Sequence, residues 1–381
     1  MDKNIDPRQQ PIRDMVKEFA EKEMYPVSEE LDRMPEPRKF PTELYKKIGE
    51  AGFIGLNMPK ELGGQGKSHL EYVTLVEELC YHDAAIGLLC AVGELATYPI
   101  LNFGSEEQKK KFVPDCATGK KIPAFVLTEP NAGSDAANQS TVAVDNGDHY
   151  IVNGEKIFIM HGDVAELGVL FCKVEGKPKL SAMIVDDTTQ PGWQARTLKN
   201  KMGMRAATTG GIILKDVKVP KENLLGEYGK GFRYAMTTLD SARIGVAAQG
   251  VGVAQRALDE SVAYAKKRQA FGQPIAKLQA IQWMIADMAT RLEAARCIMN
   301  KAVMKQDADG RFSLEAAMAK LYCTEAANFC VDRAMQIHAG YGFIGEFSVI
   351  EKLYRDQRVL EIYEGTSEVQ RLVIAGNIIG R

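Results

Sequence analysis

The feature that most constrains the fold is a change of hydrophobic period that occurs twice along the chain. Up to about residue 121, apolar residues recur at three-to-four spacing, as in Ile12–Met24, and this spacing predicts amphipathic helices. The following segment, to about residue 230, has short alternating runs such as Leu180–Val185, which are typical of strands. Long helical runs such as Gln279–Lys305 then return. The chain is therefore expected to be helical, then β, then helical again.

These changes predict three domains, with limits at 1–121, 122–230 and 231–381. The evenly spaced short strands favour a barrel or a sandwich in the middle domain. The long helical runs, joined by short loops, favour an antiparallel helical bundle at the end. With 381 residues, 45% of them hydrophobic, the chain is long enough to bury more than one core.

Composition excludes several classes of function. A net charge of -2 gives no field that favours nucleic acid or an anionic membrane. The stretch Ala84–Phe103 is long enough to span a membrane, but Glu94 and Pro99 interrupt it, so we expect a core helix and no membrane association. Five scattered histidines predict no metal site.

Cysteine usage and the amino terminus bear on location. Seven cysteines, without a C-x-x-C pair, predict packed thiols in a reducing cytoplasm. The first residues lack a basic start followed by an apolar core, so no targeting signal is expected. The expected location is cytoplasmic.

Glycine-rich stretches give weak signals. Gly340–Gly345 fits G-x-G-x-x-G, but that pattern binds a pyrophosphate only between a strand and a helix. Here it follows a helical run, so a helix stop is the better interpretation. The segment Phe125–Asp135 is different, because it leaves an apolar strand and enters a loop rich in hydroxyls. Such a loop suits a planar heterocycle and an anionic group, although an ordinary surface turn remains an equal alternative from composition alone.

The same segment resembles the L-T-E-P-x-A-G-S-D signature of the FAD-dependent acyl-CoA dehydrogenase family. The resemblance extends over the whole chain and is carried by further motifs in the family's order. These motifs are Asn153–Lys156, Arg268–Gly272, Gln336–Gly340, Leu353–Asp356 and Ile362–Glu368.

The resemblance implies a fold and an activity. The fold would be a helical domain, a β-barrel and a C-terminal four-helix bundle, assembled as a homotetramer. The activity would be α,β-dehydrogenation of an acyl-CoA with FAD as cofactor, and an electron-transferring flavoprotein would receive the electrons. Enoyl-CoA reduction in the reverse direction, a catalytically silent assembly scaffold and an acyl-CoA oxidase remain alternatives, although oxidases related to this family are generally much longer proteins.

The resemblance also implies the FAD contacts. Thr128 would offer its hydroxyl to the flavin ring, and Arg268 with Phe271 would reach the FAD of an adjacent subunit, with the Arg268 charge on the pyrophosphate. From the local sequence alone, Arg268 is interpreted as one of several solvated basic residues at the end of a helix. Met160 stands where the family usually has a threonine. The expected contacts are Phe125, Leu127, Thr128, Gly133, Ser134, Phe158, Ile159, Met160, Arg268, Phe271, Leu278, Gln279, Gln336, Ile337, Ala339, Gly340, Thr366, Ser367 and Glu368.

Glu364 is the expected catalytic base that removes the α proton. Its motif lies between two helical runs. The alternative is that Glu364 is an acidic residue that interacts favourably with the N-terminus of the next helix, but Glu368 is already suited to that role. Some family members carry the base at the position of Ala242, which cannot serve. The family implies that the backbone N–H of Glu364 and a ribityl hydroxyl of FAD hold the thioester oxygen.

The expected substrate contacts are Ser134, Asp240, Arg243, Gly365, Ala91 and Glu94. Glu94 falls where the family usually has a small polar residue in the acyl pocket. A buried unpaired carboxylate is costly, so Glu94 is expected to be paired or solvated, or else to act in acyl recognition or a second proton transfer. The substrate is expected to be a short to medium acyl-CoA, with branched and alicyclic groups left open.

Overall fold

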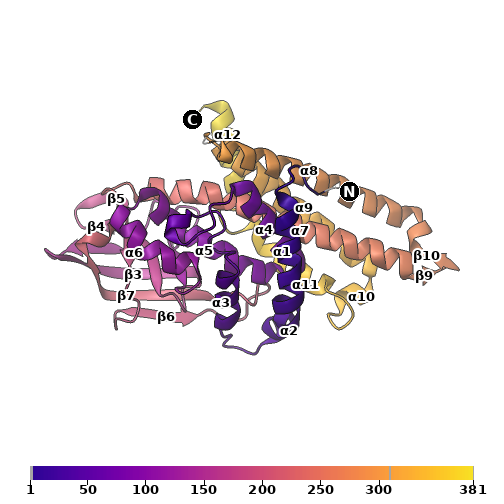
Figure 1. Ribbon diagram of the computed structural model, residues 1–381, viewed down its shortest axis with the longest axis horizontal. Helices are drawn as coiled ribbons and strands as arrows, with labels where there is room; N and C mark the ends of the chain where they lie inside the picture. The colour runs from indigo at the N-terminus through magenta and orange to yellow at the C-terminus, as the bar shows by residue number, and fades with distance from the viewer. Residues whose placement is uncertain (1–2, 309, 381) are drawn as a thin grey trace.

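The computed structural model describes residues 3–308 and 310–380. The chain begins with a helical part, packed beside the sheet and the C-terminal helices (Figure 1). Its elements are α1 (Gln9–Phe19), the π-helical turn η1 (Ala20–Met24), α2 (Tyr25–Arg33), α3 (Thr42–Glu50), η2 (Lys60–Leu62), α4 (His69–His82), α5 (Ala84–Phe103) and α6 (Glu106–Ala117).

Helix α5 is central to this part. Asp83 begins it, because its carboxylate accepts hydrogen bonds from the N–H groups of Ala85 at 2.9 Å and Ile86 at 3.2 Å. Within the described chain, α5 is the one helix long and apolar enough to cross a membrane, yet 83% of its most apolar window is buried in the protein. The helix therefore packs in the interior, as its charged and proline interruptions predicted.

The middle part is a mixed sheet with the order β6-β7-β3-β2-β4-β5-β8, and β1 pairs in parallel with β4. Its elements are β1 (Pro123–Val126), β2 (Val142–Asp145), β3 (His149–Met160), β4 (Leu167–Val174), β5 (Lys177–Val185), β6 (Trp193–Thr197), β7 (Thr209–Pro220), η3 (Lys221–Asn223) and β8 (Leu224–Leu225).

The order of a helical part, a β part and a helical part is confirmed, but the expected barrel does not close. In the described chain β6 and β8 are edges and do not pair with each other, so the sheet stays open. Alternation of apolar and polar residues along a strand predicts which face of the strand is buried, but it does not predict whether the edges of the sheet pair with each other. Register shifts near Gly154 and between Lys156 and Ile159 bend the long strands instead.

Both faces of this bent sheet are buried. On one face, Phe171 and Ile184 pack with Phe112 and Tyr234 from the flanking helices. On the other, residues of non-neighbouring strands meet in a second core that includes Trp193. Strand β4, between the two cores, has no exposed residue, whereas β6 at the edge is largely exposed.

The C-terminal part is a bundle of long antiparallel helices, as expected. Helix α9 contacts α7, α8 and α12. The small hairpin β9–β10 lies at the end of the molecule opposite the large sheet (Figure 1). The elements are α7 (Gly231–Lys267), β9 (Gln269–Ala270), β10 (Gln273–Pro274), η4 (Ile275–Lys277), α8 (Gln279–Asp307), α9 (Ser313–His338), α10 (Gly340–Phe343), α11 (Ile350–Gln357), η5 (Arg358–Glu361) and α12 (Ser367–Ile379).

The glycine motif at Gly340 falls after α9 and opens the short helix α10. A helix, not a strand, precedes it, so the interpretation as a helix stop is confirmed.

Candidate active site

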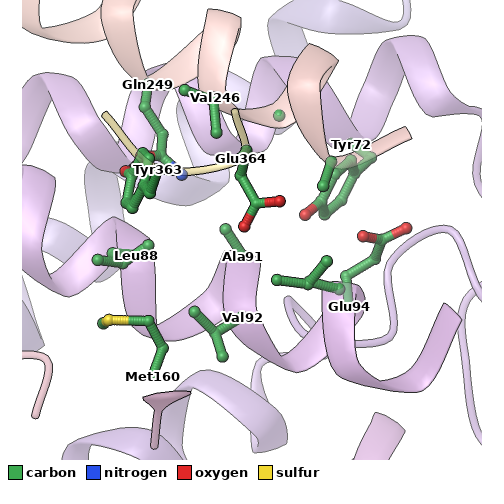
Figure 2. Close-up of a pocket in the computed structure, with 13 residues that line it drawn as sticks. Tyr72, Leu88, Ala91, Val92, Glu94, Met160, Val246, Gln249, Tyr363 and Glu364 are labelled. Atoms are coloured by element: carbon green, nitrogen blue, oxygen red, sulfur yellow. The ribbon is translucent and has the colours of Figure 1, made fainter. Parts of the chain in front are cut away.

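An apolar cavity lies where α4, α5 and α7 meet the loop that precedes α12 (Figure 2). Aliphatic and aromatic side chains form most of its wall, and two acids face it. The lining residues are Tyr72, Leu88, Ala91, Val92, Glu94, Leu95, Met160, Ala242, Gly245, Val246, Gln249, Tyr363 and Glu364.

Glu364 points its carboxylate into this cavity (Figure 2). Its Oε2 atom is buried and has no hydrogen-bond partner within the described chain. Burial raises the pKa of the carboxyl to about 7, against the opposing charges of Arg243 and Lys320. A base that takes a proton from carbon needs a free lone pair and a pKa near the working pH, and Glu364 has both.

The backbone at Glu364 is equally unusual. Glu364 has a φ of +55° and Gly365 a φ of +92°, so two successive residues lie in the left-handed region. Within the described chain the Glu364 N–H makes no hydrogen bond. It is therefore free to hold the oxygen of a bound thioester. Helix α12 then begins at Thr366, whose hydroxyl accepts from the Val369 N–H at 3.3 Å.

Glu94 is the second acid of the cavity. It is 4% exposed, and burial raises its pKa to about 7, while the charge of His69 and a hydrogen bond from Asn57 lower it. Among the residues that the structure covers, no salt bridge reaches Glu94, so ion pairing does not account for it. Tyr72 lies beside Glu94 in the view of Figure 2, with its phenol oxygen directed toward Glu364.

Met160 and Ala242 line the same cavity but cannot move a proton. The thioether of Met160, at the end of β3, accepts a hydrogen bond from the Thr209 hydroxyl at 3.2 Å, which orients its side chain. Ala242, on α7, brings only a methyl group to the position of the alternative base. Glu364 and Glu94 are thus the acids that face this site.

The loop after β1 carries the residues expected along the flavin. Lys156 of β3 fixes its inner side, donating from Nζ to the Leu127 carbonyl at 3.0 Å and to Glu129 at 2.9 Å. The outer side is open, because nothing lies within 4 Å of a Cβ placed on Gly133, and Phe158 is 66% exposed with a φ of +58°. An exposed aromatic ring beside a rigid polar loop suits a planar heterocycle, so these residues fit FAD.

Individual members of this group differ in what they can offer. Thr128 is half-buried and Ser134 is exposed, so both hydroxyls can be reached. The side chains of Leu127 and Ile159 are buried in the protein core, so these residues can face a cofactor only with backbone groups. Phe125 packs on Phe171, with ring centroids 4.9 Å apart.

The remaining expected FAD residues lie elsewhere in the chain. Arg268 and Phe271 sit at the β9–β10 hairpin, at the end of the molecule opposite the sheet (Figure 1). Phe271 is 91% exposed, and the Arg268 guanidinium lies 5.5 Å from the centre of the Tyr341 ring. The same end holds the start of α8, with Leu278 and Gln279, and the end of α9, with Gln336, Ile337, Ala339 and Gly340.

The expected FAD contacts therefore form two groups that one chain does not bring together. This separation agrees with the implied role of Arg268 and Phe271 at the FAD of an adjacent subunit. Near Glu364, Thr366 caps α12 and Glu368 is exposed, while the buried hydroxyl of Ser367 has no partner among the residues that the structure describes.

Family models cover nearly the entire chain. The acyl-CoA dehydrogenase N-terminal domain matches residues 6–120, the middle domain 124–217 and the C-terminal domain 229–379. The chain belongs to the acyl-CoA dehydrogenase family. It is an oxidoreductase that acts on CH–CH groups, with FAD as its cofactor, and the recognition from its motifs is confirmed.

Individual members of the family are similar over their full length. The caffeyl-CoA reductase-Etf complex subunit CarC of Acetobacterium woodii is 46% identical over 97% of each chain. The short-chain specific acyl-CoA dehydrogenase of Clostridium acetobutylicum is 43% identical over 99% of this chain and 100% of its own. The structure of butyryl-CoA dehydrogenase from Megasphaera elsdenii superposes with a TM-score of 0.94, at 38% identity and full coverage of both chains.

Sequence reasoning missed several residues of the site. Lys320 and Gln370 contact the Glu364 loop from α9 and α12, and Tyr72 lies in the cavity wall. Lys320 left one signal, since it is a single charge in the small and apolar run Ala316–Cys323. The structure also gives Arg243 an internal role, because its guanidinium bonds to Asp240 at 2.6 Å and to the Glu364 carbonyl at 3.2 Å.

Proposed function

We propose that this enzyme interconverts a short- to medium-chain acyl-CoA and its α,β-unsaturated enoyl-CoA, with Glu364 exchanging the α proton. The observation that carries the proposal is the unpartnered Oε2 of Glu364 in an apolar cavity. A structural carboxylate would have found a partner in the fold. A catalytic one must keep a lone pair free for the substrate.

The chain's own residues would act on the α carbon and on the thioester. The Glu364 carboxylate takes the α proton as the C–H bond breaks, and the electron pair moves toward the thioester oxygen. The free N–H of Glu364 can stabilise the negative charge that develops on that oxygen. Apolar side chains such as Leu88 and Val92 exclude water and so keep the base reactive. Transfer of the β hydrogen as hydride is the chemistry that FAD supplies when bound.

The cavity lining supports the proposed substrate size. The cavity beside Glu364 is lined by Leu88, Val92 and Leu95 of α5 and by Tyr72 of α4. The polar carboxyl group of Glu94 lies among these side chains. A cavity with this lining suits a short acyl chain better than a long straight one. The similar butyryl-CoA and short-chain enzymes agree with this size. A branched or alicyclic acyl group is a finer proposal that rests on Glu94 alone.

The reverse reaction, reduction of an enoyl-CoA, is the second candidate. A pKa of about 7 leaves Glu364 partly protonated at neutral pH, so it can also donate a proton to the α carbon. The similar protein from Acetobacterium woodii is named as a reductase in a complex with an electron-transferring flavoprotein. We propose an electron-transferring flavoprotein as the redox partner in either direction.

Assembly and location are also proposals. The separation of Arg268 from the flavin loop and the exposure of Phe271, Phe343 and Trp283 support an oligomer, and the family resemblance favours a homotetramer. Six of the seven cysteines are buried as free thiols, which supports a cytoplasmic location.

The direct test is Glu364→Gln. We expect the variant to bind FAD and acyl-CoA while turnover falls about 10²- to 10⁴-fold or more, because an amide cannot accept the α proton. Stopped-flow bleaching of the flavin under anaerobic conditions measures this step. Turnover at the wild-type rate would place the base elsewhere.

A screen with straight, branched and cyclic acyl-CoA thioesters, read by the same bleaching, identifies the acyl group. Reoxidation of the photoreduced enzyme by the matching enoyl-CoA compounds measures the reverse direction. Straight chains of short to medium length are expected to bleach fastest. Fastest bleaching by a long straight chain would contradict the proposed size.

A further inference from the structure

Two consecutive backbone carbonyls, those of Glu364 and Gly365, are gripped by side chains from three helices. Arg243 of α7 donates from Nε to the Glu364 carbonyl at 3.2 Å. Lys320 of α9 donates from Nζ to the Gly365 carbonyl at 2.8 Å. Gln370 of α12 donates to both carbonyls, at 3.1 and 2.8 Å. All three side chains are buried.

These hydrogen bonds stabilise an unfavourable backbone conformation of the loop. A non-glycine residue in the left-handed region, such as Glu364, costs about 1 kcal/mol or more unless its surroundings enforce the conformation. The loop lies between η5 and α12 and belongs to neither of them. The carbonyl contacts thus hold the backbone in the conformation that directs the carboxylate into the cavity.

Lys320 is the least expected of the three. Its side chain is fully buried, yet within the described chain its ammonium makes a single hydrogen bond and no salt bridge. Burial lowers its pKa to about 8, mainly against the attraction of Glu364. A buried ammonium with one neutral acceptor costs more than a methionine of similar shape, so stability does not explain the choice of lysine.

The charges around the base show what the ammonium adds. Glu364 feels Arg243 from α7, Lys320 from α9 and the like charge of Glu94 from α5. Arg243 lowers the pKa of the Glu364 carboxyl more than Lys320 does, but it is also paired with Asp240, 2.6 Å away. Among the described residues Lys320 has no such counterion within 4 Å, so its charge acts mainly on Glu364 and less strongly on Glu361 and Glu368.

We propose that Lys320 is a positioning residue for the α-proton base: its ammonium anchors the loop through the Gly365 carbonyl, and its charge biases the Glu364 carboxyl toward the ionised form. The inference rests on the proposed function of Glu364. It predicts that the charge and the anchor have separable effects, because one acts on protonation and the other on geometry.

The test is a titration of Glu364 in the FAD-loaded protein by the infrared absorption of its carboxyl group, with Glu364→Gln as the blank. We expect Lys320→Met and Lys320→Gln to move the titration to higher pH by about one unit or more, since each removes a nearby positive charge. Lys320→Arg should leave it close to wild type. Gln370→Leu removes two anchors but no charge, so it should slow turnover about tenfold without moving the titration.

Glu94→Gln is the matched control, because it removes a negative charge and should move the titration to lower pH. A wild-type titration in both neutral variants of Lys320 would overturn the proposal. It would also be overturned if only Lys320→Arg folded with FAD bound, since Lys320 would then be a structural support. The titration needs no turnover. A protein that neither oxidises an acyl-CoA nor reduces an enoyl-CoA would therefore reject the proposed function, and the titration could still be measured.

Discussion

At the scale of single residues, the site is governed by two acids that share one cavity. Glu364 and Glu94 each have a pKa raised to about 7, chiefly by burial, and the charge of Glu94 raises that of Glu364 further. Two carboxylates in one low-dielectric space do not ionise independently. The pair is therefore expected to hold a proton near neutral pH, which suits an enzyme whose base must both take and return one.

Glu94→Gln should stabilise the protein at high pH. The Glu94 pKa rises from 4.5 when unfolded to about 7 when folded, so the folded state holds an extra proton between these values and stability falls as the pH rises through them. An amide avoids this loss. We expect a gain of about 1–3 kcal/mol at pH 8 and a much smaller one at pH 5, measured by denaturant unfolding.

The exposed Glu155 on β3 provides the matched control. Glu155→Gln should change stability little at either pH. An equal gain from Glu94→Gln at pH 5 and pH 8 would contradict the role of its ionisation.

At the scale of elements, one ion pair joins the flavin loop to the sheet. Lys156 and Glu129 are fully buried side chains 2.9 Å apart. Lys156 also bonds to the carbonyls of Leu127 and Phe171, and Glu129 accepts from the Ser140 N–H. The pair fixes both ends of the loop that follows β1, so strand β3 holds this loop in addition to the backbone hydrogen bonds between Glu129 and Ala132 within it.

Lys156→Met should loosen this loop and weaken FAD binding. The substitution leaves the Glu129 carboxylate buried without its cation, which costs about 3–5 kcal/mol. The expected readouts are a lower melting temperature and loss of flavin during gel filtration. The double variant Lys156→Met with Glu129→Gln should recover part of the stability, because no unpaired charge remains. Full flavin retention in Lys156→Met would show that the loop holds its shape without the pair.

At the scale of the whole molecule, a buried charge network ties the parts together. Lys352 of α11 donates to Asp83, the cap of α5, at 3.0 Å and to Asp356 at 2.6 Å. Asp356 accepts from the Met204 N–H in the connection between β6 and β7, at 2.6 Å. Residues far apart in sequence therefore belong to one network of charged side chains. Helix α5, which forms part of the cavity wall, begins at a member of this network, Asp83.

Lys352→Met should destabilise the molecule as a unit. It would leave Asp83 and Asp356 buried without their shared cation, at a cost of about 3–5 kcal/mol. Circular dichroism and intrinsic fluorescence should show the same lowered transition, since the network spans helices and sheet. Lys46→Met is the control, because its pair with Glu43 is exposed and should contribute less than about 1 kcal/mol. An unchanged transition in Lys352→Met would contradict this role.

The sequence by itself determined the order of helical and β parts, the burial of α5, the start of α12 at Thr366 and the position of Glu364 in a loop between helices. These features follow from local rules, since hydrophobic period, capping residues and turn residues act within a few positions of the chain. The family motifs added FAD and the acid at 364, because motif residues keep their spacing along the chain.

Only the tertiary structure decided that the sheet stays open and that Glu94 faces the same cavity as Glu364, without an ion pair in the described part of the chain. It also decided that Lys320 and Gln370 bind the loop that carries the base. Each of these depends on which distant elements meet. The local sequence around a lysine in a helix does not predict which carbonyl the lysine will bind. The sequence of a strand likewise does not predict whether the two edges of its sheet will pair. Long-range packing sets those contacts, and no local pattern encodes them.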